Sequence, residues 1–217
     1  MDFATARQNM VESQLRTNKI TNERVLNAMR EIPRESFVPT ALRDIAYIDK
    51  GVEVAKGRFI MEPMILGRMM QACQIGKDDS VLVIGSTTGY MAAVAGKLAS
   101  SVFAVESDAD LAKQSADLLT KMAMDNIIIE QGPLVSGWAK QGPFNVILID
   151  GAVDEVPGAI LDQLSEGGRL LAVINKNELV GVMTIFKMQN GHISKTSLFD
   201  ANIDSLSEFK RESTFVF

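Results

Sequence analysis

The sequence contains very few of the residues that form disulfides, thiolate metal sites and histidine-dependent active sites. Its 217 residues include one cysteine, Cys73, and one histidine, His192. A single cysteine cannot form a disulfide within the chain, and a thiolate-rich zinc site needs at least two. We therefore expect no metal centre. His192 is the one candidate base for a Ser-His-Asp triad, but its place directly after the Asn190-Gly191 pair favours a structural role in a turn.

Positive charge and long apolar runs are also scarce. The chain has 22 Lys and Arg against 27 Asp and Glu, which leaves a net charge of −5. Electrostatic binding of nucleic acid needs a basic face, so we expect no nucleic-acid partner. No run approaches the ~20 apolar residues of a membrane-spanning helix, and residues 1–15 lack the apolar stretch of a targeting signal. We expect a cytoplasmic protein with no membrane partner.

Hydrophobic periodicity divides the chain into two parts. Up to about residue 78, apolar residues recur at helical spacings, with a helix expected over 63–75 after an irregular stretch at 47–57. From residue 79 onward, apolar strands alternate with helices, and the strands are expected at 80–84, 102–105, 126–129, 145–149 and 169–174. We treat 1–217 as a single domain, in which 1–78 form an N-terminal helical extension and 79–217 an α/β core.

The alternation of strands and helices predicts an α/β fold with a doubly wound, mostly parallel sheet. Two further strands are expected at 180–188 and 192–199, on either side of Asn190-Gly191, because Asn-Gly is a strong hairpin signal. The core is therefore expected to end in an antiparallel edge hairpin. Residues 214–217 are a candidate for one more edge strand.

Parallel α/β sheets bind ligands beyond the carboxyl ends of their strands. The residues expected there are the glycine-containing loop 85–89, Glu106, Gly132 and Asp150. Glu106 follows Gly85 by 21 residues and ends the next strand, where an acid can accept two hydrogen bonds from a ribose diol. This pattern predicts a nucleoside site. A tight turn, with Glu106 as a solvated strand end, explains the same residues about as well.

Over about residues 10–175, the order of segments resembles the protein-L-isoaspartate O-methyltransferase family. The segments that carry the resemblance include Ile32-Pro33-Arg34-Glu35-Ser36-Phe37-Val38-Pro39, Val81-Leu82-Val83-Ile84-Gly85, Gly89-Tyr90-Met91-Ala92-Ala93-Val94 and Gly142-Pro143-Phe144-Asn145-Val146-Ile147. The Pro-Arg-Glu-x-Phe-Val-Pro segment and its distance from the glycine loop are specific to this family, and are not shared by methyltransferases at large.

The resemblance implies a Rossmann-like methyltransferase sheet of seven strands, with S-adenosyl-L-methionine as the cofactor. The residues implied to bind this cofactor are Gly85, Ser86, Gly89, Glu106, Gly132 and Asp150. Among them, Glu106 would hold the ribose and Asp150 would close the pocket. The implied reaction is methylation of the carboxyl group of isoaspartyl residues in damaged proteins or peptides. We expect the protein to act as a monomer or a weak homodimer.

Several positions depart from the family pattern. Phe59 and Met61 stand where the family has a threonine and a serine at the active site, and neither side chain can donate a hydrogen bond to a carboxylate. In the cofactor loop, Thr87 replaces a glycine and Val83 replaces an acid. Pro133 takes the place of the aspartate expected at the adenine. The catalytic residues therefore stay unassigned.

Two functions remain open from the sequence. The first is an S-adenosylmethionine-dependent methyltransferase of the isoaspartyl type. The second is a catalytically inactive protein that keeps the methyltransferase fold as a binding or assembly module. A cofactor cleft filled by the chain's own side chains, particularly Phe59, Met61 or Leu134, would favour the second function. An open cleft with Glu106 pointing into it would favour the first.

Four methionines are expected to form an apolar patch around the acceptor site. They are Met61, Met64, Met69 and Met70. Packing in the hydrophobic core explains the methionines better than an adaptable protein-binding surface does, although such a surface is the alternative. Cys73, within an apolar helical pattern, is expected to be a small buried side chain.

Overall fold

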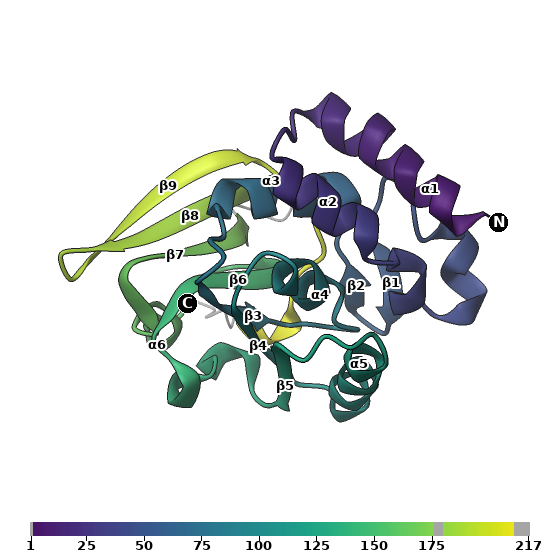
Figure 1. Ribbon diagram of the computed structural model, residues 1–217. Coiled ribbons are helices and arrows are strands. Elements are labelled where there is room, and N and C mark those ends of the chain that lie inside the picture. Colours follow the sequence, from purple (N-terminus) through teal and green to yellow (C-terminus); the bar gives the residue numbers. More distant parts are fainter. Residues whose placement is uncertain (1, 176–179, 211–217) are drawn as a thin grey trace, which may run out of the picture.

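A seven-stranded sheet forms the centre of the computed structural model, which describes residues 2–175 and 180–210 (Figure 1). The strands are β3 (Ser80–Ile84), β4 (Ser101–Glu106), β5 (Ile127–Gln131), β6 (Phe144–Val153), β7 (Leu164–Asn175), β8 (Gly181–Gln189) and β9 (His192–Asp200). Their order across the sheet is β5-β4-β3-β6-β7-β8-β9. Strands β3 to β7 pair in parallel, whereas β8 is antiparallel to both neighbours. The predicted doubly wound sheet with an antiparallel edge hairpin is confirmed.

Apolar side chains cover both faces of this sheet. In β3, Val81 and Val83 lie in the hydrophobic core on one face, whereas Leu82 and Ile84 lie in the core on the other. Successive side chains of a strand point to opposite faces, so a strand that is buried on both sides must be apolar throughout. This explains why the central strands β3 and β6 appear in the sequence as continuous apolar runs.

Helices and short helical turns complete the two cores. One core contains side chains from η1 (Met10–Leu15), α2 (Glu23–Glu31), α3 (Pro63–Cys73) and α4 (Tyr90–Gly96). The other contains side chains from η5 (Leu134–Ser136), α6 (Gly158–Leu161) and η7 (Ser207–Phe209). Helix α5 (Ala109–Lys121) packs against β4 and β5. The remaining helical segments are α1 (Phe3–Asn9), η2 (Arg16–Asn18), η3 (Arg34–Phe37), η4 (Thr40–Ile45) and η6 (Ala139–Gln141).

The N-terminal helices share a core with the sheet. The side chain of Asn22 accepts hydrogen bonds from the backbone N–H groups of Arg24 and Val25 at 3.0 and 3.4 Å and so begins α2. The guanidinium of Arg24 then donates to the carbonyl oxygens of Ile75 and Leu98 at 2.8 and 2.6 Å. Because Leu98 follows α4 in the α/β core, this side chain fastens the N-terminal extension to the core.

Three sequence expectations differ from the structure or lie outside it. The stretch 47–57 is not wholly irregular, because β1 (Val52–Ala55) pairs antiparallel with β2 (Arg58–Ile60). The fourth parallel strand does not end at residue 149, since β6 continues to Val153 through a shift in its pairing with β7. The candidate strand at 214–217 lies outside the described residues.

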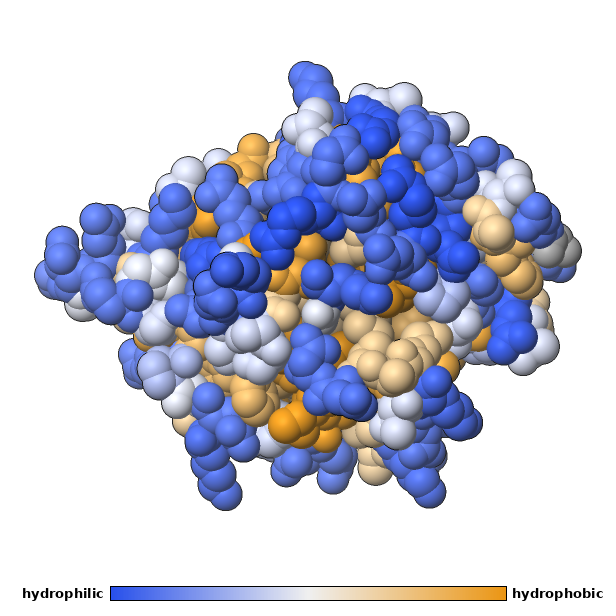
Figure 2. All heavy atoms as spheres, in the orientation of Figure 1, coloured by the Kyte–Doolittle hydropathy of each residue, from blue (hydrophilic) through white to orange (hydrophobic). Residues whose placement is uncertain are grey.

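Most of the face in Figure 2 is hydrophilic, and apolar atoms reach the surface around the sheet edge formed by β5. Ile128 of β5 is one of the large apolar side chains exposed there. Within the described residues, none of the helices combines the length and the apolar character that a membrane span requires.

Candidate functional site

Glu106 is the last residue of β4, and its carboxylate is completely buried. The Thr87 backbone N–H donates to Glu106 Oε2 at 2.8 Å, and the Asp108 backbone N–H donates to Oε1 at 3.1 Å. The structure therefore brings Glu106 beside the loop that follows β3, as the sequence predicted. The alternative of a solvated strand end is wrong, because this acid has no exposed surface.

The loop between β3 and α4 takes the tight path that its glycines predict. Gly85 and Gly89 have φ angles of 78° and 93°, a region that favours glycine. Thr87 has a φ angle of 55°, so this threonine adopts the left-handed conformation that a glycine would adopt freely. Its hydroxyl donates to the carbonyl oxygen of Gly85 at 3.0 Å. That hydrogen bond, with the one to Glu106, holds Thr87 in an unfavourable backbone conformation.

Two hydroxyl groups of this loop make no hydrogen bond to any of the described residues. Ser86 Oγ and Thr88 Oγ1 are buried and have no hydrogen-bond partner within the part of the chain that the structure describes. A buried hydroxyl without a partner costs roughly 1–3 kcal/mol. A polar ligand at the loop would remove that cost, so these two groups fit a bound cofactor.

Leu206 lies directly over the same loop. It is buried, and a Cβ atom added at Gly151 would come within 2.6 Å of Leu206 Cγ, while one added at Gly85 would come within 3.1 Å of Leu206 Cδ1. Backbone pairing holds Leu206 in place: Ala152 N–H donates to Asp204 O and Leu206 N–H donates to Ala152 O, both at 2.9 Å. The chain's own side chain therefore fills part of the expected cofactor cleft.

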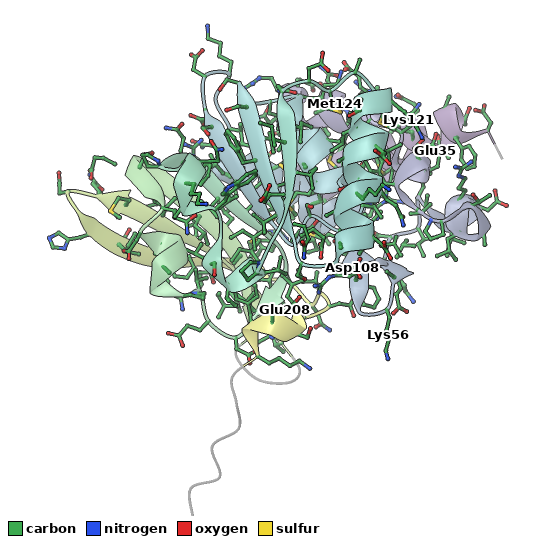
Figure 3. All side chains as sticks on the ribbon, turned by 90° about the horizontal axis from the view of Figure 1, so that it is seen from below. Glu35, Lys56, Asp108, Lys121, Met124 and Glu208 are labelled. Atoms are coloured by element: carbon green, nitrogen blue, oxygen red, sulfur yellow. The ribbon has the colours of Figure 1, made fainter. Side chains whose placement is uncertain are left out.

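An arginine from the hairpin β1–β2 pairs with the buried acid. Arg58 Nε donates to Glu106 Oε1 at 3.3 Å, and Arg58 Nη2 donates to Ser107 Oγ at 2.7 Å. The Arg58 guanidinium also pairs with the carboxylate of Glu208, which accepts a hydrogen bond from Ser107 Oγ at 2.7 Å. We refer to Arg58, Glu106, Ser107 and Glu208 as the Arg58 cluster. Figure 3 shows Glu208 on η7, on the same side of the molecule as Asp108 at the start of α5.

The charge on Glu208 depends on this cluster. Burial by itself would raise the pKa of Glu208, but hydrogen bonds from Arg58 and Ser107 outweigh burial and lower the pKa to about 2. Glu208 is therefore ionised at neutral pH. Arg58 consequently lies between two carboxylates, one from the end of β4 and one from the C-terminal part of the chain.

The pKa of Asp150 is shifted upward, in contrast to that of Glu208. Burial raises the pKa of Asp150 to about 8; the charge of Arg34 lowers this pKa, whereas that of Glu106 raises it further. Arg34 is itself buried, and its guanidinium donates to the carbonyl oxygens of Ala46 and Met61 at 2.6 and 2.8 Å. At neutral pH, Asp150 is therefore mainly a neutral carboxylic acid that can donate a hydrogen bond.

A narrow cavity lies beside Asp150. Its lining includes Phe59, Met61, Glu62, Asp150, Ser205 and Leu206. The two positions at which the family pattern has hydroxyl groups therefore both line this cavity beside Asp150. Phe59 and Met61 bring no hydroxyl to this cavity. Met61, Met69 and Met70 are buried, which confirms core packing as the main role of these methionines.

The side chains that fill the cleft differ from those expected. Met61 and Leu134 are buried, but the side chain over Gly85 and Gly151 is Leu206. The sequence analysis missed Arg58, Leu206 and Glu208. The only local signal was that Arg58 stands within the segment that departs from the family pattern at position 59. Leu206 and Glu208 lie in a stretch with no recognisable motif.

Comparison with known proteins assigns the chain to a family. The profile described as "Protein-L-isoaspartate(D-aspartate) O-methyltransferase (PCMT)" matches residues 5–202. The protein-L-isoaspartate O-methyltransferase of Koribacter versatilis is 41% identical over 198 residues, which cover 91% of this chain and 89% of that protein. A second enzyme of that name from Shewanella sediminis is 40% identical over 169 residues, 78% of this chain and 69% of its own length.

Solved structures agree in fold. A protein-L-isoaspartate O-methyltransferase structure superimposes with a TM-score of 0.80 at 24% identity, covering 93% of this chain and 66% of that chain. A Plasmodium falciparum β-aspartate methyltransferase, solved in complex with S-adenosyl-L-homocysteine, also gives a TM-score of 0.80 at 21% identity, covering 96% of this chain and 99% of that chain. At these identities the likeness concerns the fold alone.

Proposed function

Because this chain belongs to the protein-L-isoaspartate(D-aspartate) O-methyltransferase family, we propose that it transfers a methyl group from S-adenosylmethionine to the carboxyl group of isoaspartyl residues in proteins or peptides. The observation that carries the proposal is the placement of Glu106. This acid ends β4, next to the glycine loop that follows β3. In nucleotide-binding α/β folds an acid at this place holds the ribose diol of the cofactor.

The chemistry requires few groups from the protein. S-adenosylmethionine supplies an activated methyl group when it is bound, and an acceptor carboxylate is already a nucleophile. The protein therefore has to align the two partners and exclude water. We assign Glu106 to the ribose, the loop of Gly85, Ser86 and Gly89 to the methionine side, and Asp150 to the closed end of the pocket.

The residues present fit the cofactor only when the C-terminal part of the chain has moved. The buried hydroxyls of Ser86 and Thr88 are suitable partners for a polar ligand. Leu206 and Arg58, in contrast, lie against the glycine loop and Glu106, where the cofactor is proposed to bind. The proposal therefore includes a rearrangement that separates Leu206 from the loop and Arg58 from Glu106.

Calorimetry with S-adenosylhomocysteine and methylation of an isoaspartyl peptide test this function. We expect binding of S-adenosylhomocysteine, and methyl transfer to the isoaspartyl peptide but not to the matching aspartyl peptide. Glu106→Gln should weaken binding at least tenfold because the charged acceptor is lost. Glu130→Gln, on the exposed part of β5, is the matched control and should leave binding unchanged. Absence of both binding and transfer in the parent protein would overturn the proposal.

A second function is supported by the filled cleft. Leu206 fills the space beside Gly85 of the glycine loop, and Phe59 and Met61 bring no hydroxyl to the acceptor side. These features favour a catalytically inactive relative that uses the fold as a binding or assembly module. The two functions differ in one measurement, since a module would show no methyl transfer even at saturating S-adenosylmethionine and isoaspartyl peptide.

We further propose that the protein acts in the cytoplasm as a monomer or weak homodimer, on a protein or peptide partner. The net charge of −5 supports a partner other than nucleic acid. Size-exclusion chromatography with light scattering tests the oligomeric state. A single species of 23.7 kDa at micromolar concentration is expected, and a stable larger assembly would contradict the proposal.

A further inference from the structure

We propose that residues 201–210, the C-terminal segment, act as a built-in competitor of the cofactor, so that S-adenosylmethionine or its product binds only after this segment has left the cleft. The inference rests on the proposed assignment of the cleft to S-adenosylmethionine. It goes beyond that assignment because it identifies which part of the chain controls access to the cleft, and through which contacts.

The first contact is steric. Leu206 is buried against Gly85 and Gly151, two positions at which the backbone leaves space because neither residue has a side chain. A ligand that approaches the glycine loop needs the same space. Leu206 and a cofactor at this loop therefore exclude one another.

The second contact is electrostatic. Arg58 donates to Glu106, the acid that is assigned to the ribose, and also pairs with Glu208 of the C-terminal segment. While the guanidinium stays there, Glu106 already has a charged partner in addition to its two backbone N–H donors. Glu208 stabilises this arrangement because it shares Arg58 with Glu106. A ribose at Glu106 would have to displace Arg58, and with it the contact to Glu208.

The third contact is apolar and lies around Leu134, which follows Pro133, the position at which the family pattern has an aspartate at the adenine. Phe209 and Leu206 belong to the same buried cluster as Leu134 and Val105. Leu134 begins η5, which packs against η7. The C-terminal segment thus covers all three expected parts of the cofactor site, with Leu206 at the loop, Glu208 at the ribose acid and Phe209 in the cluster around Leu134.

Few backbone hydrogen bonds attach the segment to the sheet. Its release would remove the apolar contacts of Leu206 and Phe209 but would not break the pairing of the seven strands. The last backbone bond to the edge hairpin runs from Ala201 N–H to Gly181 O at 2.9 Å. Beyond it, two backbone hydrogen bonds join residues 204 and 206 to Ala152. Asn202, Asp204 and Ser207 are exposed. Displacing residues 202–210 would leave the seven-stranded sheet intact, since the segment contributes no strand to it.

Calorimetry compares S-adenosylhomocysteine binding by the full-length protein and by the double variant Leu206→Ala/Glu208→Gln. Both substitutions weaken the segment's contacts and leave the loop and Glu106 unchanged. We expect the double variant to bind at least tenfold more tightly than the parent. Lys210→Gln, an exposed position in the same segment, is the matched control and should bind within twofold of the parent. Equal affinity of parent and double variant would overturn the inference.

Hydrogen exchange on the parent protein gives a second measurement that does not depend on the variants folding. Adding S-adenosylhomocysteine should speed exchange of the Leu206 amide, which is bonded to Ala152 O, at least tenfold. The amide of Ile147, within β6 at the centre of the sheet, should stay protected. If S-adenosylhomocysteine binds while the Leu206 amide stays equally protected, the segment does not leave and the inference is wrong.

The inference and the proposed function fail in different ways. If the double variant gains affinity but transfers no methyl group to an isoaspartyl peptide, the competitor role stands and the proposed reaction is wrong. If the parent transfers methyl groups while the Leu206 amide stays protected, the reaction stands and the competitor role is wrong. If neither protein binds S-adenosylhomocysteine, both are wrong, because releasing the segment did not create a cofactor site.

Discussion

The guanidinium of Arg58 lies 3.3 Å from the carboxylate of Glu106, a side chain with no exposed surface. The two residues come from different parts of the fold, the small hairpin β1–β2 and the end of β4. A buried acid that has a charged partner is stable in its ionised form, but removing one member of such a pair leaves the other charge buried. This pairing makes Arg58 a determinant of both stability and ligand access.

Replacing Arg58 should therefore destabilise the protein. We expect Arg58→Met to lower the free energy of unfolding by about 3 kcal/mol, because the buried carboxyl group of Glu106 would lose its cationic partner. Urea denaturation measures the effect. Arg16→Met, which removes exposed ion pairs with Glu12 and Glu23, is the control and should cost much less. The double variant Arg58→Met/Glu106→Gln should recover part of the loss, and no recovery would show that the pair is not the cause.

The backbone at Thr87 predicts an unusual pattern of substitution effects. Thr87→Val keeps the branched side chain in the left-handed conformation but loses the hydroxyl that donates to Gly85. Thr87→Gly removes the steric cost at this φ angle. We expect the valine variant to be less stable than the glycine variant by about 1–2 kcal/mol in thermal or urea unfolding. The reverse order would mean that Thr87 is not strained.

Asp150 should make the stability of the protein dependent on pH. Its pKa is raised to about 8 in the folded protein, from an ordinary value near 3.8, so the folded state binds a proton that the unfolded state has released between these two values. Stability from this group is present at low pH and is lost as the pH rises towards 8.

The variant Asp150→Asn cannot lose a proton at this position. Relative to the parent, it should therefore gain stability as the pH rises from 5 to 8, by about 1 kcal/mol per pH unit. Urea unfolding at several pH values measures the difference. Parallel stability curves for the two proteins would contradict the raised pKa.

Cys73 should be chemically inert in the folded protein. It is buried in α3, burial raises its pKa to about 12, and its thiol donates to the carbonyl oxygen of Met70 at 3.1 Å. Because the thiolate is the reactive form, a disulfide reagent should react at a rate limited by unfolding. Reaction should be immediate in concentrated urea. Rapid reaction under native conditions would show that α3 opens or that the thiol is accessible.

The sequence predicted the parallel strands and the helix at 63–75 because their signals are local. Continuous apolar runs such as 80–84 indicate strands that are covered on both faces, and the Asn190-Gly191 pair indicates the hairpin of β8 and β9. The hairpin β1–β2 was missed because its strands are short and partly exposed, which leaves little periodicity to detect. The end of β6 was misplaced because its bulge depends on pairing with β7.

Spacing along the chain was enough to predict the fold, the glycine loop and the place of Glu106 at a strand end, because parallel strands end at one edge of the sheet. The residues that cover this edge could be identified only from the folded chain. Arg58 and Glu106 are 48 residues apart, and Arg58 and Glu208 are 150 residues apart. No local pattern encodes such contacts. The first depends on how the hairpin β1–β2 packs against the end of β4, and the second depends on how the C-terminal segment packs against the sheet.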